Sequence, residues 1–147
     1  MRMWINGVWV DSTSGQVIEV TDPATEEVLD TVPAGTPADV EQAVAAAKAA
    51  FPAWRQTTAV ERAQMLHQAA TRMRDHFDEL VRLLTLEEGK PVPENAEEID
   101  WSLNTLDYYA ELGRHIRGRV IPSPAVGQLS LVLKEPYGVV GCIVPWN

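Results

Sequence analysis

The chain has 147 residues, of which 46% are hydrophobic and 22% charged, a composition typical of a single globular domain. Its 12 Lys and Arg against 21 Asp and Glu give a formal net charge of −9, which argues against a protein that binds nucleic-acid phosphates. One cysteine excludes an intramolecular disulfide framework, and no apolar run reaches the ~20 residues of a membrane helix. Because the N-terminus turns polar too soon for a secretory signal, we expect a cytoplasmic protein with neither nucleic acid nor membrane as partner.

Two β-hairpins are predicted in the first third of the chain. Residues 4–5 and 8–10 flank Asn6-Gly7, the preferred pair for a type I′ turn because both of its central positions have positive φ. A second strand pair is expected over 17–21 and 27–32, with a turn-forming Asp-Pro between them. Isolated hairpins are only marginally stable, so both should lie against something larger.

A first helix should begin after Thr36, which offers an N-cap hydroxyl before Pro37 and the first-turn acid Asp39. Pro52 should disturb or end this helix near Trp54, because proline lacks the N–H that the helix needs. Apolar residues recur at helical spacing along it, and many of them are alanines. Alanine-rich faces allow close approach, so we expect the helices to form a compact layer.

Three further helices follow in the same block. The capping-box pattern of Thr58 and Glu61 begins one whose apolar face runs to Phe77. A third helix, over 80–86, should stop at Gly89, with prolines beyond it. The fourth should start at Asn95 and end before Gly113.

The last third returns to strands. Residues 119–121 form a short strand, and 128–134 alternate between apolar and polar side chains. Residues 138–144 are apolar on both faces, which is typical of a central strand in a parallel sheet covered by helices. Such a strand needs parallel neighbours, yet the chain stops at Asn147, so we expect it to be part of a larger protein.

Most polar candidates have an ordinary structural interpretation. The histidines should have surface or capping roles, and the paired glutamates should lie on solvated faces, since adjacent helical residues do not face each other. These residues are His67, His76, His115, Glu87, Glu88, Glu97 and Glu98. Cys142, within an apolar strand, is interpreted as a buried structural thiol. For the basic cluster of Arg114, Arg117 and Arg119, a surface or subunit contact is favoured over an anion site.

Pro145, Trp146 and Asn147 follow the expected central strand at its carboxyl end, where ligands bind in open α/β sheets. The Asn147 amide could donate to developing negative charge, and the two preceding side chains could wall an apolar slot. Spacing alone leaves a loop-packing role equally open.

The sequence resembles the amino-terminal third of the NAD(P)-dependent aldehyde dehydrogenase superfamily over nearly its whole length. Individually several of the matching stretches are weak, but their order and spacing are specific. They are Ile5-Asn6-Gly7, Asp22-Pro23-Ala24-Thr25, Phe51-Pro52-Ala53-Trp54, Glu61-Arg62, Glu87-Glu88-Gly89-Lys90-Pro91, Leu106-Asp107-Tyr108-Tyr109-Ala110, Glu135-Pro136-Tyr137-Gly138-Val139-Val140-Gly141 and Ile143-Val144-Pro145-Trp146-Asn147.

The resemblance implies a mechanism in which a cysteine thiolate attacks an aldehyde, hydride passes to NAD(P)⁺, and a glutamate activates the hydrolytic water. It assigns Asn147 to the oxyanion site as the catalytic residue of this segment. Cofactor contacts are implied for the residues before it, which are Ile143, Val144, Pro145 and Trp146. In some members a structural monovalent cation lies near the positions of Val20, Thr21 and Glu98, but no metal ligand is assigned here.

The nucleophilic cysteine, the glutamate base and the glycine-rich cofactor turn lie further along a family chain, and Cys142 does not match the nucleophile. The 147-residue chain alone should therefore be inactive. We expect an incomplete α/β fold: hairpins and helices of the cofactor-binding domain over 1–118, a strand segment resembling the oligomerisation arm over 119–135, and the first strand of a Rossmann-like parallel sheet over 136–147.

The resemblance further implies a small-molecule aldehyde substrate, NAD or NADP as cofactor, and a homo-dimer or homo-tetramer. Two alternatives remain open from the residues. One is a non-catalytic fragment that acts in subunit assembly or binding, and the other is a related reductase of acyl phosphates or acyl-CoA.

Overall fold

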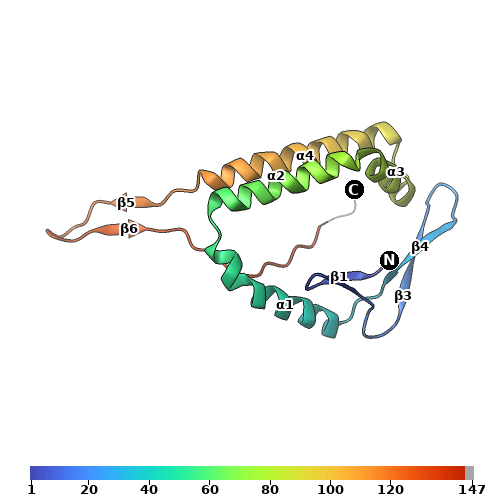
Figure 1. Ribbon diagram of the computed structural model, residues 1–147, viewed down its shortest axis with the longest axis horizontal. Coiled ribbons are helices and arrows are strands. Elements are labelled where there is room, and N and C mark those ends of the chain that lie inside the picture. Colours follow the sequence, from blue (N-terminus) through green and yellow to red (C-terminus); the bar gives the residue numbers. More distant parts are fainter. Residues whose placement is uncertain (145–147) are drawn as a thin grey trace.

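The computed structural model describes residues 1–144, which form four helices and three two-stranded antiparallel sheets (Figure 1). The first sheet pairs β1 (Met3–Ile5) with β2 (Val8–Val10). Asn6 and Gly7 connect them with φ of 51° and 78°, as the type I′ turn requires, so the first predicted hairpin is confirmed.

The second hairpin pairs β3 (Val17–Thr21) with β4 (Val28–Pro33), again close to the predicted bounds. The Asp22 carboxylate accepts the backbone N–H of Ala24 at 2.8 Å and so shapes the connecting turn. The register of the pair shifts between Val20 and Thr21.

Helix α1 (Pro37–Gln56) begins with the predicted N-cap, because the Thr36 hydroxyl accepts from the Asp39 N–H and Asp39 accepts from the Thr36 N–H. Pro52 is predicted to disturb or end this helix near Trp54, but it lies inside the helix, which continues to Gln56. Because proline has no backbone N–H, one helical hydrogen bond is missing, and the remaining turns stay intact.

The next two helices are α2 (Ala59–Asp75) and α3 (Phe77–Glu88). The Thr58 capping box at the start of α2 is confirmed, and so is the stop of α3 at Gly89, which has a left-handed φ of 73°. Phe77 was expected on the second helix but begins α3. The reason is His76, whose φ of −110° and ψ of 19° break the helix one residue earlier.

Helix α4 (Val92–Arg114) is longer than predicted at both ends. It starts three residues before Asn95, because Pro93 in the first turn has no intrahelical N–H to satisfy and fits there. It also runs through Gly113, which the sequence pattern placed beyond the helix end.

The hydrophobic core lies between α2, α3 and α4. Ala70, Val81, Ile99 and Leu103 are buried at its centre, and partly buried apolar side chains surround them. Figure 1 shows α2 and α4 running side by side with α3 across one end, whereas α1 lies apart from this group. The expected single helical layer is therefore only partly correct, because the alanine face of α1 lies against the first hairpin.

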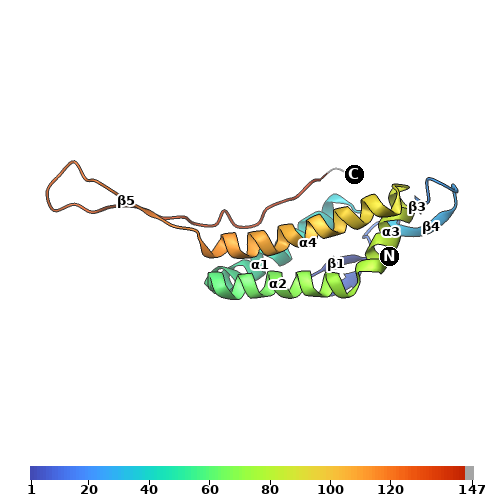
Figure 2. The same cartoon turned by 90° about the horizontal axis from the view of Figure 1, so that it is seen from above.

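An arm projects beyond the helices (Figure 2). Its strands are β5 (Arg119–Ile121) and β6 (Ser130–Val132), which confirms strand structure within the predicted stretch but over fewer residues. At the base of the arm the backbone segments that lead into β5 and out of β6 approach closely: a Cβ built on Gly118 would lie 2.6 Å from the carbonyl oxygen of Val132. Only glycine fits there without a shift of the backbone.

Residues 136–144 run back past the helices as an irregular segment, and the expectation of a strand over 138–144 is not met within the described chain. A strand requires hydrogen bonds to a neighbouring strand, and no segment of residues 1–144 pairs with this one. For the same reason Cys142 is exposed, which corrects its interpretation as a buried thiol.

None of the helices in the described part of the chain is both long enough and apolar enough to cross a membrane.

Candidate functional site

The residues predicted to form the catalytic and cofactor site lie at the end of the chain. Pro145, Trp146 and Asn147 fall outside the described residues. Ile143 and Val144 are described and are exposed at 101% and 81%, so no other part of residues 1–144 covers their side chains.

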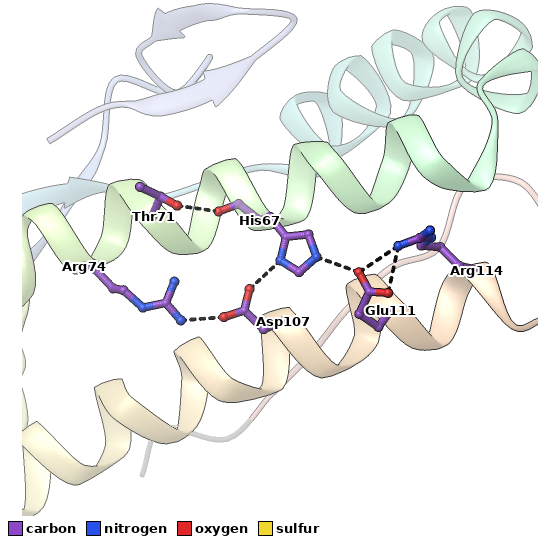
Figure 3. A network of polar contacts seen from close by, with 6 residues as sticks. All are labelled: His67, Thr71, Arg74, Asp107, Glu111 and Arg114. Carbon is purple, nitrogen blue, oxygen red and sulfur yellow. Dashed lines mark hydrogen bonds and ion pairs between the residues drawn. The ribbon is translucent and has the colours of Figure 1, made fainter.

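A polar network of charged side chains joins α2 to α4 (Figure 3). The His67 ring projects from α2 between two carboxylates of α4: Nδ1 lies 2.6 Å from Asp107 Oδ1, and Nε2 lies 2.9 Å from Glu111 Oε1. A neutral imidazole has one donor and one acceptor, whereas the imidazolium has two donors. Only the protonated ring can therefore donate to both carboxylates at once.

Two arginines extend this network along the helices. Arg74 Nη2 lies 2.5 Å from Asp107 Oδ2, and Arg114 Nη1 donates to Glu111 Oε2 at 3.0 Å (Figure 3). The hydrogen bonds from Arg74 and then His67 lower the pKa of Asp107, and the His67 hydrogen bond lowers that of Glu111. The hydrogen bonds to Glu111 and Asp107 raise the pKa of His67. Each group thus favours the charged form of its neighbours.

The arrangement suits a structural role. The His67 side chain is 40% exposed, and within residues 1–144 no three His, Cys, Asp or Glu side chains are placed to hold a metal ion. We interpret the network as a link that holds α2 against α4. The sequence pattern predicted a surface or capping role for His67 and did not indicate this link, although the spacing of Asp107 and Glu111 places them on one face of a helix.

A second ionic cluster surrounds Lys90, directly after α3. Its ammonium group is paired with Glu98 of α4 and lies 3.5 Å from Glu88 Oε2, and the pairing with Glu98 raises the pKa of Lys90. The Glu88 side chain is only 6% exposed. The prediction of solvated glutamate faces is therefore wrong for Glu88, because the chain turns at Gly89 and brings Lys90 over it.

One of the positions suggested for a monovalent cation takes part in this pairing. Val20 and Thr21 lie in β3, and the carboxylate of Glu98 is paired with Lys90. The other two histidines have the expected capping positions: His76 lies between α2 and α3, and His115 ends α4. Of the arginine cluster, Arg114 pairs with Glu111, while Arg117 donates to backbone carbonyls.

Comparison with known proteins identifies the class. The family model described as "Aldehyde dehydrogenase family" matches residues 9–147. The chain is 41% identical over 97% of its length to succinate-semialdehyde dehydrogenase [NADP(+)] from Escherichia coli, and 42% identical over 99% to glutarate-semialdehyde dehydrogenase from Pseudomonas putida. It spans about 30% of the length of each of these relatives.

Solved structures agree with this assignment. The crystal structure of succinate-semialdehyde dehydrogenase from Burkholderia pseudomallei matches 92% of this chain with a TM-score of 0.89 and 38% identity, over 28% of its own chain. Betaine aldehyde dehydrogenase from Staphylococcus aureus, in complex with NAD⁺, matches 88% with a TM-score of 0.84 and 34% identity, over 27% of its own chain. The chain belongs to the aldehyde dehydrogenase family, and its α/β structure is a part of that fold.

Proposed function

We propose that the whole protein to which this segment belongs oxidises an aldehyde to a carboxylic acid with NAD⁺ or NADP⁺. The observation that carries the proposal is the family match, which extends through Asn147 and includes relatives about 40% identical along nearly all of this chain. The names of the relatives include an NADP(+)-dependent enzyme, and several neighbouring structures contain NAD. These names support a nicotinamide cofactor without choosing between its two forms.

In this proposal Asn147 is the catalytic residue of the segment. When a nucleophile adds to the aldehyde carbonyl, its oxygen gains negative charge, and the Asn147 side-chain NH₂ donates a hydrogen bond to it. The nucleophile itself is not assigned to this chain, because exposed Cys142 precedes Asn147 by five residues and does not match the nucleophile's position.

The residues before Asn147 are proposed to form one wall of the cofactor site. Ile143 and Val144 supply apolar side chains for contact with a flat nicotinamide ring, and Pro145 and Trp146 continue this wall. NAD(P)⁺, when bound, supplies the hydride acceptor of the reaction. The role of this chain is to orient the ring and exclude water from one side of it.

The substrate is proposed to be a small aldehyde that carries a carboxylate at its other end. Two relatives are named for succinate semialdehyde and glutarate semialdehyde. Both of these compounds carry a carboxylate at the end opposite the aldehyde, and the two compounds differ by one methylene. An added methylene changes binding by only ~1–3 kcal/mol, so activity on both compounds is expected.

The three parts of the segment have separate proposed roles. Residues 1–118 belong to the cofactor-binding domain, 119–135 form an arm that contacts a partner subunit in a homo-dimer or homo-tetramer, and 136–147 enter the parallel sheet. The exposed apolar residues of β5 and β6, which include Val120 and Leu131, support a contact for the arm.

The proposal is tested with the protein expressed from its whole reading frame. The rate of NAD⁺ or NADP⁺ reduction is measured from the absorbance of the reduced cofactor. Succinate semialdehyde and glutarate semialdehyde should be oxidised faster than betaine aldehyde, which has a cationic end in place of the carboxylate. The 147-residue chain alone should show no turnover. Cofactor reduction by the short chain would contradict the assignment of the nucleophile to another segment. Absence of turnover with every aldehyde in the whole protein would contradict the proposed activity.

A further inference from the structure

A cavity of about 770 Å³ lies at the base of the β5–β6 arm. The end of α1, the start of α2, the end of α4 and the chain leaving β6 form its walls, and Figure 1 shows these segments meeting where the arm leaves the helices. Its volume is in the range of small-molecule sites in proteins. It involves none of the residues assigned above to catalysis or to the cofactor.

The charges around this cavity are unusual for an acidic protein. Five cationic side chains line it, and among the described residues Glu135 is the one carboxylate in the lining. The cations are Arg55, Arg62, Arg114, Arg117 and Lys134. In a chain with a formal net charge of −9, this local excess of positive charge favours an anion as occupant.

Two of the cations are already neutralised. Arg55 Nη2 lies 3.4 Å from Glu135 Oε2, and Arg114 is bonded to Glu111. No carboxylate within residues 1–144 forms an ion pair with Arg62, Arg117 or Lys134. Within the described part of the chain, these three positive charges have no carboxylate partner.

Both of the unpaired arginines are held in place by neutral oxygen atoms. Arg62 Nη1 donates to the carbonyl oxygen of Thr57 at 2.5 Å, and Arg117 Nη1 donates to the carbonyls of Arg114 and Ile116 at 3.0 and 3.2 Å. A guanidinium has five N–H donors, so both groups keep donors for a ligand while their positions are set. Pre-positioned groups lose less conformational entropy when they bind.

The cavity also has an apolar wall, which includes the partly buried ring of Phe51 and the half-exposed indole of Trp54. A phosphate group carries close to two negative charges at neutral pH and three acceptor oxygens, which matches several cations better than a single carboxylate does. We propose that this cavity binds a small organic phosphate, with the phosphate on Arg62, Arg117 and Lys134 and the organic part against Trp54.

Calorimetric titration of the whole protein tests the site with phenyl phosphate and with pyrophosphate. Both probes should bind, and phenol should not, because it lacks the phosphate. Lys134→Gln should weaken both by roughly tenfold, as expected for loss of one charge-assisted contact. This variant removes a side chain that makes no described hydrogen bond or ion pair, so the fold should be retained. Trp54→Ala should weaken phenyl phosphate and leave pyrophosphate unchanged.

The matched control is the double variant Lys48→Gln/Arg72→Gln, compared with Arg117→Gln/Lys134→Gln. Lys48 and Arg72 are exposed on α1 and α2 and do not line the cavity, and both double variants change the net charge equally. The control should bind both probes like the wild type. Equal weakening in the two double variants, or no binding of either probe to the wild type, would overturn the proposal. Aldehyde oxidation is read separately, so a failure of this site leaves the proposed activity untouched.

Discussion

Nδ1 of His67 lies 2.6 Å from Oδ1 of Asp107, and this contact joins α2 to α4 across 40 positions of sequence. The second ring nitrogen contacts Glu111 one helical turn further along α4. Because α2 and α4 enclose the core with α3, the orientation of these two helices depends in part on the charge of one imidazole.

The His67 link should make stability depend on pH. The two carboxylates raise the pKa of His67 above its ordinary value of 6.5, so the folded state binds the proton more tightly than the unfolded state. The stabilisation is then fully present below about pH 6.5 and is lost as pH rises through the higher folded-state value. We expect the difference in urea midpoint between wild type and His67→Gln to shrink over that interval. A difference that is constant with pH would contradict the protonated link.

Asp39 should make folding stability depend on pH in the opposite direction, with stability lost as the solution becomes acidic. Its carboxylate accepts hydrogen bonds from the backbone N–H groups of Thr13 and Thr36 and from the Ser12 hydroxyl, and these hold its pKa well below the ordinary 3.8. Its stabilisation is therefore present above that value and lost as pH falls through the folded-state value. Thermal unfolding of Asp39→Asn should be less dependent on acid than that of wild type. Asp11→Asn, which removes an exposed carboxylate nearby, should retain the wild-type acid dependence.

Gly89→Ala should destabilise the contact between α3 and the second hairpin. A Cβ at Gly89 would lie 2.6 Å from Cγ of Pro23, and its φ of +73° disfavours any side chain. The conformational cost is ~1–2 kcal/mol, and the crowding adds ~1–3 kcal/mol. Urea unfolding measures the sum. In the background of Pro23→Ala the cost should fall to the conformational part, and an unchanged cost would mean that the chain relaxes away from the contact.

Leu103→Ala should lower the free energy of unfolding by ~2–5 kcal/mol, because it leaves a cavity in the core. Leu103 is 3% exposed and packs among Ala70, Val81 and Ile99. Leu83→Ala removes the same atoms from a position that is 39% exposed and should cost much less. Equal losses in the two variants, measured by urea denaturation, would show that the core of α2, α3 and α4 is not the main source of stability.

Asn147→Ala, in the whole protein, should lower kcat by ~10²–10³ with little change in the KM for aldehyde. The reason is that the proposed donor acts on charge that develops only in the transition state. Asn104→Ala removes an exposed amide from α4 and should leave kcat unchanged. Steady-state kinetics with succinate semialdehyde separates the two constants, and a loss confined to KM would assign Asn147 to ground-state binding.

Local structure was predictable wherever a few neighbouring residues decide it. The Asn6-Gly7 turn, the caps at Thr36 and Thr58 and the stop at Gly89 each depend on one or two side chains acting on adjacent backbone, and all four occur as predicted. The predicted helix ends near Pro52 and Gly113 were less accurate, because the hydrogen bonds of the surrounding turns outweigh a single unfavourable residue.

By itself the sequence determined the hairpins, the four helices and membership of the family, because turn chemistry, capping and ordered motifs are local properties of the chain. Tertiary structure alone decided that His67 faces two carboxylates, that Lys90 covers Glu88, and that unpaired arginines gather at the base of the arm. These contacts join residues from separate elements, and their distances depend on how the helices pack. The missing strand over 138–144 has the same cause, since a strand forms only where a neighbour supplies the partner hydrogen bonds.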